Sequence, residues 1–324
     1  MEKELFKRLN RLNNKERNIF NRIFEIIDEK AYLKLTPKLL KNFSQAKNQN
    51  IIIIRNKILN QETHFNFWRS KRKEPRKVNE LKNDYDPFCD VYNLTPEDNF
   101  GRLENESAIT ASNLAKSAKN HSLVIFKQHS FNKNDIKNAF NLAIEWFNKF
   151  NSICRIIIWN YGYRAGASIF HPHLQIFSLD YIPLKINYLF EKFKEYKNKY
   201  QSDYLDDVFL VYSSLGLAQN LNDLKIYTSL TPFKDDEIIF FNQNKIENNL
   251  EELSNLIFSY YRQLKIENFN FFLIEYNSNF LGFIVNRGES TKINSDIGAL
   301  EIYAFSIVSY NPFDLATKLF KSRS

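Results

Sequence analysis

The order of patterned segments between residues 123 and 179 constrains the fold most strongly. A short apolar strand pattern at 123–127 precedes a helical pattern at 133–151, and two further strand patterns follow at 153–159 and 168–179. A turn that contains glycines, and no helix, connects the last two strands. This order favours an antiparallel α+β arrangement over a doubly wound parallel sheet.

A similar order of strands, helix and strands recurs after Tyr181, although no literal sequence repeat is visible. We therefore expect two pseudo-repeated halves in a single domain, at residues 51–190 and 191–324. Asn311 and Pro312 suit the cap and the first turn of a terminal helix. The second half has strand patterns at residues 224–230, 237–241, 269–276, 280–286 and 298–307, and helical patterns at 246–265 and 312–321.

The first 50 residues look like an addition to these halves. Residues 1 to about 46 carry apolar side chains at helical spacing, which predicts two or three amphipathic helices. We expect a helical N-terminal extension over 1–50, then strands at 51–54 and 63–68. The polar stretch at 78–117 predicts loops with short elements. The apolar positions of the helical pattern are Leu5, Leu9, Leu12, Ile19, Ile23, Ile26 and Ile27.

Charge and cysteine content narrow the class of protein. The chain has 45 Lys and Arg against 37 Asp and Glu, a net charge of +8, which favours phosphate-bearing ligands, whether nucleotides or nucleic acid. Two cysteines, Cys89 and Cys154, give no basis for a disulfide framework, and a single bridge between them is the alternative. No apolar run is long enough to span a membrane, and the charged first residues do not resemble a secretory signal. We expect a cytoplasmic protein without a membrane partner.

Glycine and histidine are scarce, so the positions that keep them are informative. Gly162 and Gly166 lie within eleven residues of His171 and His173, which places two of seven glycines and two of five histidines in one short window. The period of two along a strand at 168–179 aligns both histidines and Gln175 on one face. Burial of these groups without partners costs each about 1–3 kcal/mol, so a ligand, a metal or a hydrogen-bond network is implied.

The same window suits phosphoryl chemistry. Glycines and other small residues let backbone N–H groups approach a phosphate, and Asn160 at the end of the preceding strand pattern can bind a phosphate or ribose oxygen. A histidine nucleophile needs one ring nitrogen bare and the other hydrogen-bonded. The carbonyl of His171 is a candidate acceptor for His173. Two structurally satisfied strand histidines are the alternative. The other small residues of the window are Ala165, Ala167 and Ser168.

Residues 160–175 read Asn-x-Gly-x-x-Ala-Gly-Ala-Ser-x-x-His-Pro-His-x-Gln. This run resembles the active-site signature of the galactose-1-phosphate uridylyltransferase branch of the histidine triad (HIT-like) superfamily. The resemblance implies a HIT-like fold in which His173 becomes a nucleotidyl-histidine and Gln175 binds phosphoryl oxygens. The residues that it implies around the phosphates are Asn160, Gly166, Ala167 and Ser168.

Weaker similarities extend from about residue 51 to residue 320. The run Asp86-Pro-Phe-Cys89 is similar to a Cys-x-x-Cys of the family, with Asp in the first place, and His129 ends a strand as another family ligand does. The resemblance therefore implies a structural zinc held by Asp86, Cys89, His129 and His171, although separate residues without a metal are an equal alternative.

Further binding residues come from the same resemblance. It implies that Arg69 or Arg72 contacts the nucleotide phosphate or base, and that Glu301 orients a sugar hydroxyl. A solvated basic loop and a plain surface carboxylate are the corresponding alternatives. Relatives are commonly dimers, so a homodimer is expected as well.

The expected function is nucleotidyl transfer, with UDP-glucose and galactose 1-phosphate as first choice among nucleotide sugars and sugar 1-phosphates. Leu174 stands where uridylyltransferases usually have a small residue and is more like the dinucleoside-polyphosphate phosphorylases. A phosphorylase acting on an ADP-sugar or a dinucleoside polyphosphate is therefore the second hypothesis. A nucleotide- or RNA-binding protein without catalysis is the third, and nucleic acid is not the expected partner.

Overall fold

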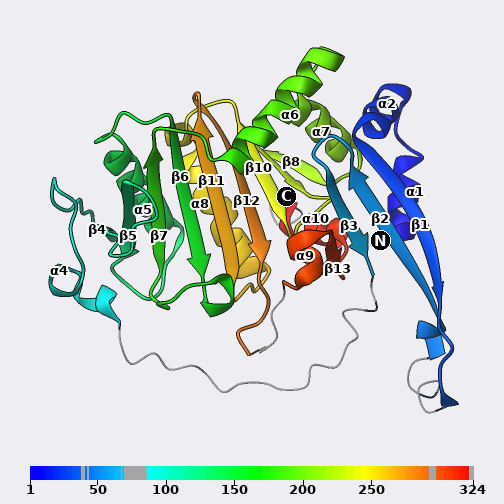
Figure 1. Cartoon of the computed structure of the whole chain (residues 1–324), viewed down its shortest axis with the longest axis horizontal. Helices are drawn as coiled ribbons and strands as arrows, with labels where there is room; N and C mark the ends of the chain where they lie inside the picture. Colours follow the sequence, from blue (N-terminus) through cyan, green and yellow to red (C-terminus); the bar gives the residue numbers. More distant parts are fainter. Residues whose placement is uncertain (38–40, 42–43, 67, 69–85, 292–296, 321–324) are drawn as a thin grey trace.

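The computed structural model describes residues 1–37, 41, 44–66, 68, 86–291 and 297–320. Within these residues, strands form a nine-stranded sheet in the order β4-β5-β7-β6-β11-β12-β10-β9-β8 and a four-stranded sheet in the order β1-β2-β3-β13 (Figure 1). The strands of the large sheet are β4 (Ala108–Ser112), β5 (Asn120–Phe126), β6 (Cys154–Tyr161), β7 (His173–Leu179), β8 (Ala218–Leu221), β9 (Leu224–Thr228), β10 (Ile238–Asn242), β11 (Phe269–Tyr276) and β12 (Asn279–Asn286).

The large sheet consists of two halves with the same connectivity. The first half runs β4-β5-β7-β6 with α5 (Lys133–Phe147) between β5 and β6, and the second runs β9-β10-β12-β11 with α8 (Leu250–Gln263) between β10 and β11. All neighbouring strands are antiparallel, and the halves join where β6 pairs with β11. The expected α+β fold with pseudo-repeated halves is confirmed.

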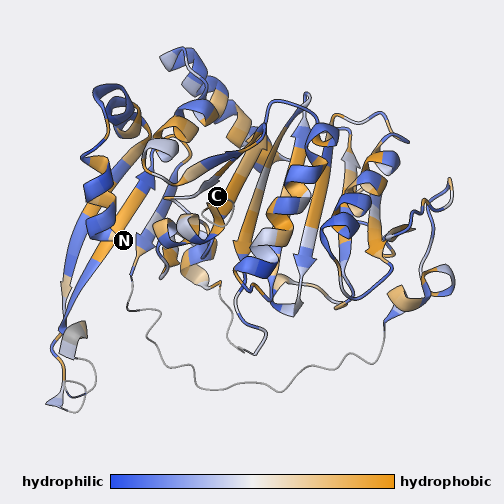
Figure 2. Ribbon diagram, turned by 180° about the vertical axis from the view of Figure 1, so that it is seen from behind, coloured by the Kyte–Doolittle hydropathy of each residue, from blue (hydrophilic) through white to orange (hydrophobic). Residues whose placement is uncertain are grey.

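Helices α5 and α8 cover one face of the large sheet, as the view from behind shows (Figure 2). Apolar side chains of both helices meet those of the strands in one core, in which Trp146, Trp159 and Phe271 are fully buried. Burial of such large aromatic side chains is the main stabilising term of this layer. Both halves are therefore fixed on one common helical layer.

The opposite face is covered differently in the two halves. Over the second half, α6 (Leu184–Tyr200) and α7 (Tyr204–Ser214) pack against β9 to β12, and α1 (Glu2–Leu9) and α2 (Asn14–Ile23) join the same core. Over the first half, a smaller cluster packs on β4 and β5 around Phe88 and Val91. On β7, Phe177 and Leu179 join the core of the second half, whereas Phe88 of the smaller cluster packs against His173. Among the described residues, the remaining helices are α4 (Val91–Leu94), α9 (Ala299–Tyr303) and α10 (Pro312–Phe320), and the 3₁₀ segments are η1 (Ser44–Lys47), η3 (Pro87–Asp90), η4 (Tyr163–Ala165) and η5 (Ile246–Asn249).

The four-stranded sheet corrects the expected helical extension. Helices α1 and α2 are present, but the helix expected around Ile26 and Ile27 is wrong, because β1 (Phe24–Tyr32) pairs along its whole length with β2 (Asn48–Asn56). Strand β3 (Gln61–Phe65) follows, and β13 (Ser306–Val308) adds in parallel. A pattern within one segment does not reveal a partner strand that lies outside it. The two ends of the chain thus meet in one sheet.

Other boundaries also differ from the expectation. The strand expected at 298–307 is wrong in its first part, where α9 forms and the Glu301 carboxylate accepts the backbone N–H of Gly298. The strand expected from 168 begins only at His173, after Pro172. The boundary expected at 190/191 falls inside α6, and helices α6 and α7 were not predicted. These two helices pack on the face of the large sheet opposite α5 and α8. Sequence periodicity does not specify which face of a sheet a helix covers.

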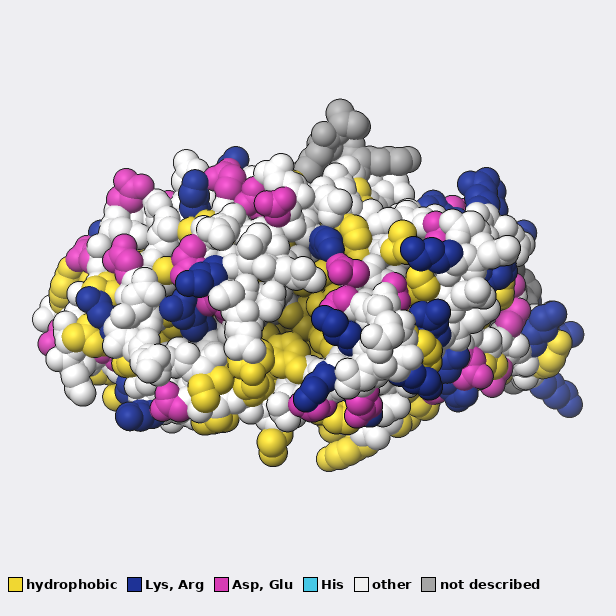
Figure 3. All heavy atoms as spheres, turned by 90° about the horizontal axis from the view of Figure 1, so that it is seen from above, with side chains coloured by type: hydrophobic (Ala, Val, Ile, Leu, Met, Phe, Trp, Pro, Cys, Tyr) yellow, Lys and Arg dark blue, Asp and Glu magenta, His cyan; other side chains and the backbone are white. Residues whose placement is uncertain are grey.

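The surface seen from above has a hollow near its middle in which hydrophobic side chains gather (Figure 3). Basic and acidic side chains are mixed around it and do not form one basic track on this face. None of the described helices combines the length and the apolar character needed to cross a bilayer.

Candidate active site

Strand β7 presents the residues of the sequence motif on two faces. Leu174 and Ile176 are fully buried in the core against the helices. His173 and Gln175 alternate with them and face the other side, so the expected common face is confirmed for these two. His171 precedes the strand, and its ring and that of His173 both pack against Phe88. Because Leu174 points into the core, its identity is set by packing rather than by contact with a ligand.

His173 has one ring nitrogen engaged and one bare. Its Nδ1–H donates to the carbonyl of His171 at 2.8 Å, the acceptor that the sequence suggested. A neutral imidazole carries a single hydrogen, so Nε2 keeps its lone pair. Only 7% of the residue is exposed, and burial lowers the pKa of His173, which favours the neutral ring. The edge of Phe88 packs against this ring, with 5.0 Å between the ring centroids. The geometry is that of an oriented nucleophile.

A tight turn that precedes the strand is open on one side. Gly162 and Gly166 have φ of +84° and +89°, values that favour glycine. No atom lies within 4 Å of the place that a Cβ on Gly166 would occupy, so this part of the turn is open. Ala167 is buried, whereas Ser168 is exposed beside it. Backbone N–H groups of such a turn suit a phosphate.

The second half of the chain fixes Asn160 and the turn. The Nδ2 of Asn270, on β11, donates to Asn160 Oδ1 at 2.7 Å and to the carbonyl of Ala165 at 2.8 Å. Arg287 donates through Nη1 to Asn270 Oδ1. Since its carbonyl oxygen is already bonded, Asn160 offers its amide N–H groups to a ligand. Asn270 and Arg287 were missed by sequence reasoning, because only the pairing of β6 with β11 brings them here.

Gln175 also has a partner that the sequence did not indicate. Its Oε1 lies 3.1 Å from Nε2 of His121, a residue on β5 that is 1% exposed. The ring of His121 stacks on Phe177, with 3.9 Å between the centroids. The scarcity of histidine was the only signal for His121 in the sequence.

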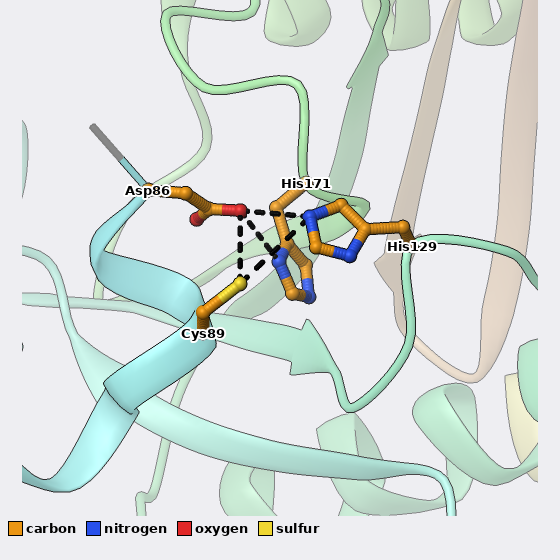
Figure 4. A group of neighbouring side chains, drawn as sticks. All are labelled: Asp86, Cys89, His129 and His171. Carbon is orange, nitrogen blue, oxygen red and sulfur yellow. Dashed lines mark hydrogen bonds and ion pairs between the residues drawn. The ribbon is translucent and has the colours of Figure 1, made fainter. Parts of the chain in front are cut away.

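The four residues expected as metal ligands converge on one point (Figure 4). Asp86 and Cys89 lie at the start and inside η3, His129 follows β5, and His171 precedes β7. Their candidate ligand atoms all lie within 4.8 Å of one another. Asp86 Oδ2 is 2.9 Å from His129 Nε2, 3.0 Å from His171 Nδ1 and 3.4 Å from Cys89 Sγ.

The contacts of His171 test whether a cation fits this group. Its Nε2–H donates to the carbonyl of Phe126 at 2.6 Å, so the ring already has its one hydrogen on that side. Nδ1 nevertheless faces the Asp86 carboxylate, and this partly buried contact requires either a hydrogen between the two atoms or a shared metal ion. Burial and Asp86 raise the pKa of the Cys89 thiol, and a bound metal ion would hold it as thiolate. The oxygen, sulfur and two nitrogen donors fit zinc.

Three further residues are expected from the sequence to contact the substrate. Glu301 lies on α9 beside the four-stranded sheet, several strands away from β7, and its side chain caps that helix (Figure 1). The structure therefore does not bring Glu301 to His173 within one chain. Arg69 and Arg72 lie outside the described residues.

Comparison with known proteins identifies the fold. No family model matches the sequence, and no curated protein sequence does. An ADP-glucose phosphorylase from Arabidopsis thaliana with bound ADP-glucose is 17% identical, with a TM-score of 0.61 over 82% of this chain and 97% of that chain. A GalT-like protein from Arabidopsis thaliana is 18% identical, with a TM-score of 0.59 over 82% of this chain and 97% of that chain.

A uridylyltransferase structure is 12% identical, with a TM-score of 0.55 over 83% of this chain and 98% of that chain. The chain therefore has a HIT-like α+β fold. Within that class, the similar structures are of the GalT type, so the resemblance that the motif indicated is confirmed at the level of the fold.

Proposed function

We propose that the protein is a nucleotidyltransferase that works through a nucleotidyl-histidine on His173. The observation that carries this proposal is the hydrogen bond from His173 Nδ1 to the carbonyl of His171, which leaves Nε2 bare. In the first half reaction, Nε2 forms a bond to the α-phosphorus, and the bond from phosphorus to the bridging oxygen breaks. The leaving phosphate departs with that oxygen, and the His171 carbonyl stabilises the charge that the ring gains.

In the second half reaction, a phosphate oxygen of the acceptor attacks the same phosphorus, and the bond to Nε2 breaks. The ring returns to its neutral form with its hydrogen still on Nδ1. The amide groups of Gln175 and Asn160, the Ser168 hydroxyl and the backbone of the glycine turn bind the phosphoryl oxygens in both steps. Phosphate leaving groups need little help from an acid, which fits the lack of an assigned general acid among these residues.

The donor that we favour is a nucleotide sugar, with a sugar 1-phosphate as acceptor. UDP-glucose and galactose 1-phosphate are the first choice, because the motif is similar to that of the uridylyltransferases. Phosphorolysis of an ADP-sugar is the second candidate, because a solved structure with this fold is an ADP-glucose phosphorylase with bound ADP-glucose. Leu174 does not favour either reaction, because it packs in the core.

We further propose that Asp86, Cys89, His129 and His171 hold a structural zinc ion. Its role would be to fix η3 and the segment before β7, and thereby the carbonyl that orients His173. Zinc is not required for any step at phosphorus in this scheme.

Isotope exchange tests the proposal. The purified chain is incubated with UDP-glucose and labelled glucose 1-phosphate, with ADP-glucose and the same label, or with diadenosine tetraphosphate and labelled ATP. A covalent intermediate transfers the label into the donor without any further acceptor, and the donor that exchanges identifies the nucleotide.

His173→Ala is expected to abolish exchange, whereas His64→Ala, which removes a ring stacked on Phe305 in the small sheet, is expected to retain it. Exchange in His173→Ala would show that another residue is the nucleophile. No exchange by the folded wild-type chain with any donor would favour the nucleotide-binding or RNA-binding hypothesis instead.

A further inference from the structure

His121 is held rigidly beside Gln175. It is the second residue of β5, it is buried, and its ring stacks on Phe177 with 20° between the ring planes. Both of its ring nitrogens have partners: Nδ1 lies 3.0 Å from the backbone nitrogen of Ser117, and Nε2 lies 3.1 Å from Gln175 Oε1. A buried imidazole with this many contacts has a fixed orientation.

The backbone of Ser117 determines where the ring hydrogen lies. A backbone N–H is always a donor, so Nδ1 of His121 must accept, and a neutral ring then carries its hydrogen on Nε2. Burial lowers the pKa of His121, in agreement with a neutral ring. Nε2–H faces Gln175, so the atom of Gln175 that meets it must be the carbonyl oxygen. This assignment follows from the fixed backbone N–H of Ser117 and holds for either starting orientation of the Gln175 amide.

The carboxamide of Asn113 competes for the same nitrogen. Its Nδ2 lies 3.0 Å from His121 Nε2, while its Oδ1 accepts the exposed N–H of Ala115. Moving the ring hydrogen to Nδ1 would set it against the backbone N–H of Ser117, which is not able to turn. Asn113 is able to turn its amide so that its oxygen faces His121, because water can replace that oxygen at the exposed N–H of Ala115. The hydrogen therefore stays on Nε2.

The consequence concerns the other end of the Gln175 amide. With its carbonyl oxygen bonded to His121, the group that remains for a ligand is the amide nitrogen with its two hydrogens. Amide hydrogens attract phosphoryl oxygens, whereas the carbonyl end would repel them. The two ring nitrogens of His121 are both occupied, so this residue is not itself a nucleophile or an acid.

We propose that His121 is a positioning residue of the transfer site, which holds the carbonyl end of Gln175 so that its N–H groups face the transferred phosphoryl group. This inference rests on the proposed nucleotidyl transfer at His173. It identifies a residue on β5, outside the sequence motif, that determines which end of the motif glutamine meets the substrate.

Two variants separate the hydrogen bond from the packing. His121→Phe keeps a ring to stack on Phe177 but lacks the donor, and His121→Gln keeps an N–H donor at a similar reach. The measurement is the single-turnover rate of His173 nucleotidylation, with the dissociation constant of the donor determined separately. We expect His121→Phe to react about 10- to 100-fold more slowly, with a smaller change in donor affinity, and His121→Gln to recover most of the rate. An unchanged rate in His121→Phe, or no recovery in folded His121→Gln, overturns the proposal.

A double variant distinguishes positioning from a general structural effect. If His121 acts through Gln175, the His121→Phe/Gln175→Ala chain reacts as fast as Gln175→Ala alone. A further loss of similar size in the double variant would show that His121 acts by another route and would overturn the proposal.

The ring tautomer gives a readout that does not depend on activity. Long-range proton–nitrogen NMR of the wild-type chain, with His121→Phe for assignment, is expected to show a hydrogen on Nε2 of His121. A hydrogen on Nδ1 overturns this inference alone and leaves the nucleotidyl transfer intact. A wild-type chain that forms no adduct with any nucleotide donor overturns both proposals.

Discussion

Gly162→Ala is expected to destabilise the fold strongly, because two costs add at this position. The backbone has φ of +84° and ψ of +157°, a region that only glycine adopts easily, which costs about 1–3 kcal/mol. A Cβ would also lie 2.1 Å from Asn268 Oδ1. Asn268 would have to move, although it is buried and bonds Gly288 at 2.8 Å, Ser290 at 2.9 Å and the backbone N–H of Arg164 at 3.3 Å. Loss of these three bonds costs about 1 kcal/mol each, so the total is about 4–6 kcal/mol.

Gly166→Ala is the matched control for this prediction. Its φ of +89° is similar, but a Cβ would meet no atom within 4 Å, so only the backbone cost of about 1–2 kcal/mol applies. The assay is urea denaturation of both variants and the wild type, with equal m-values as the test of a common unfolding reaction. Equal destabilisation by the two substitutions would refute the contact with Asn268 as the cause of the difference.

Three further predictions concern other parts of the chain. Burial raises the pKa of Glu237 to about 7, above its unfolded value, so the stability that the protonated group contributes is present in acid and is lost as pH rises through about 7. The free energy of unfolding should fall by up to about 3 kcal/mol between the unfolded pKa and about pH 7. Urea denaturation measures this profile, and Glu237→Gln should flatten it. Metal analysis of the purified protein should find stoichiometric zinc. Cys89→Ala should lose the zinc, and its melting temperature should be at least about 5 °C lower. A metal-free wild type would contradict the zinc proposal. Asn270→Ala removes the donor to Asn160 and should lower the free energy of unfolding by about 2–3 kcal/mol. The control Asn279→Ala, in an exposed turn, should lower it by less than about 0.5 kcal/mol. Similar values for the two variants would contradict the role of Asn270.

The chemistry of the motif was predictable because it depends on residues that are close in sequence. The alternation of a strand separates His173 and Gln175 from Leu174, and the carbonyl two residues earlier is within reach of the His173 ring. The partners that orient the motif were not predictable in this way. His121 comes from a neighbouring strand and Asn270 from the other half, and strand pairing brings both to the site.

The same distinction explains which elements were found. Strand β11 and helix α10 were expected almost at their observed bounds, because each has its own clear pattern and turn residues. Strand β1 was expected as a helix, because Ile26 and Ile27 continue the helical spacing of the preceding segment, and only the nine-residue pairing with β2 shows a strand. The four candidate metal ligands were expected from resemblance, and the fold brings three separate segments together to assemble them.

The most direct test of the account is to identify the atom that carries the nucleotide. The chain, labelled with ¹⁵N-histidine, is reacted with the donor that supports exchange, quenched in alkali and analysed by peptide fragmentation and by phosphorus–nitrogen coupling in NMR. We predict a nucleotidyl group on Nε2 of His173, because Nδ1 is bonded to the carbonyl of His171. An adduct on Nδ1, an adduct on another residue, or none with any nucleotide donor would contradict it.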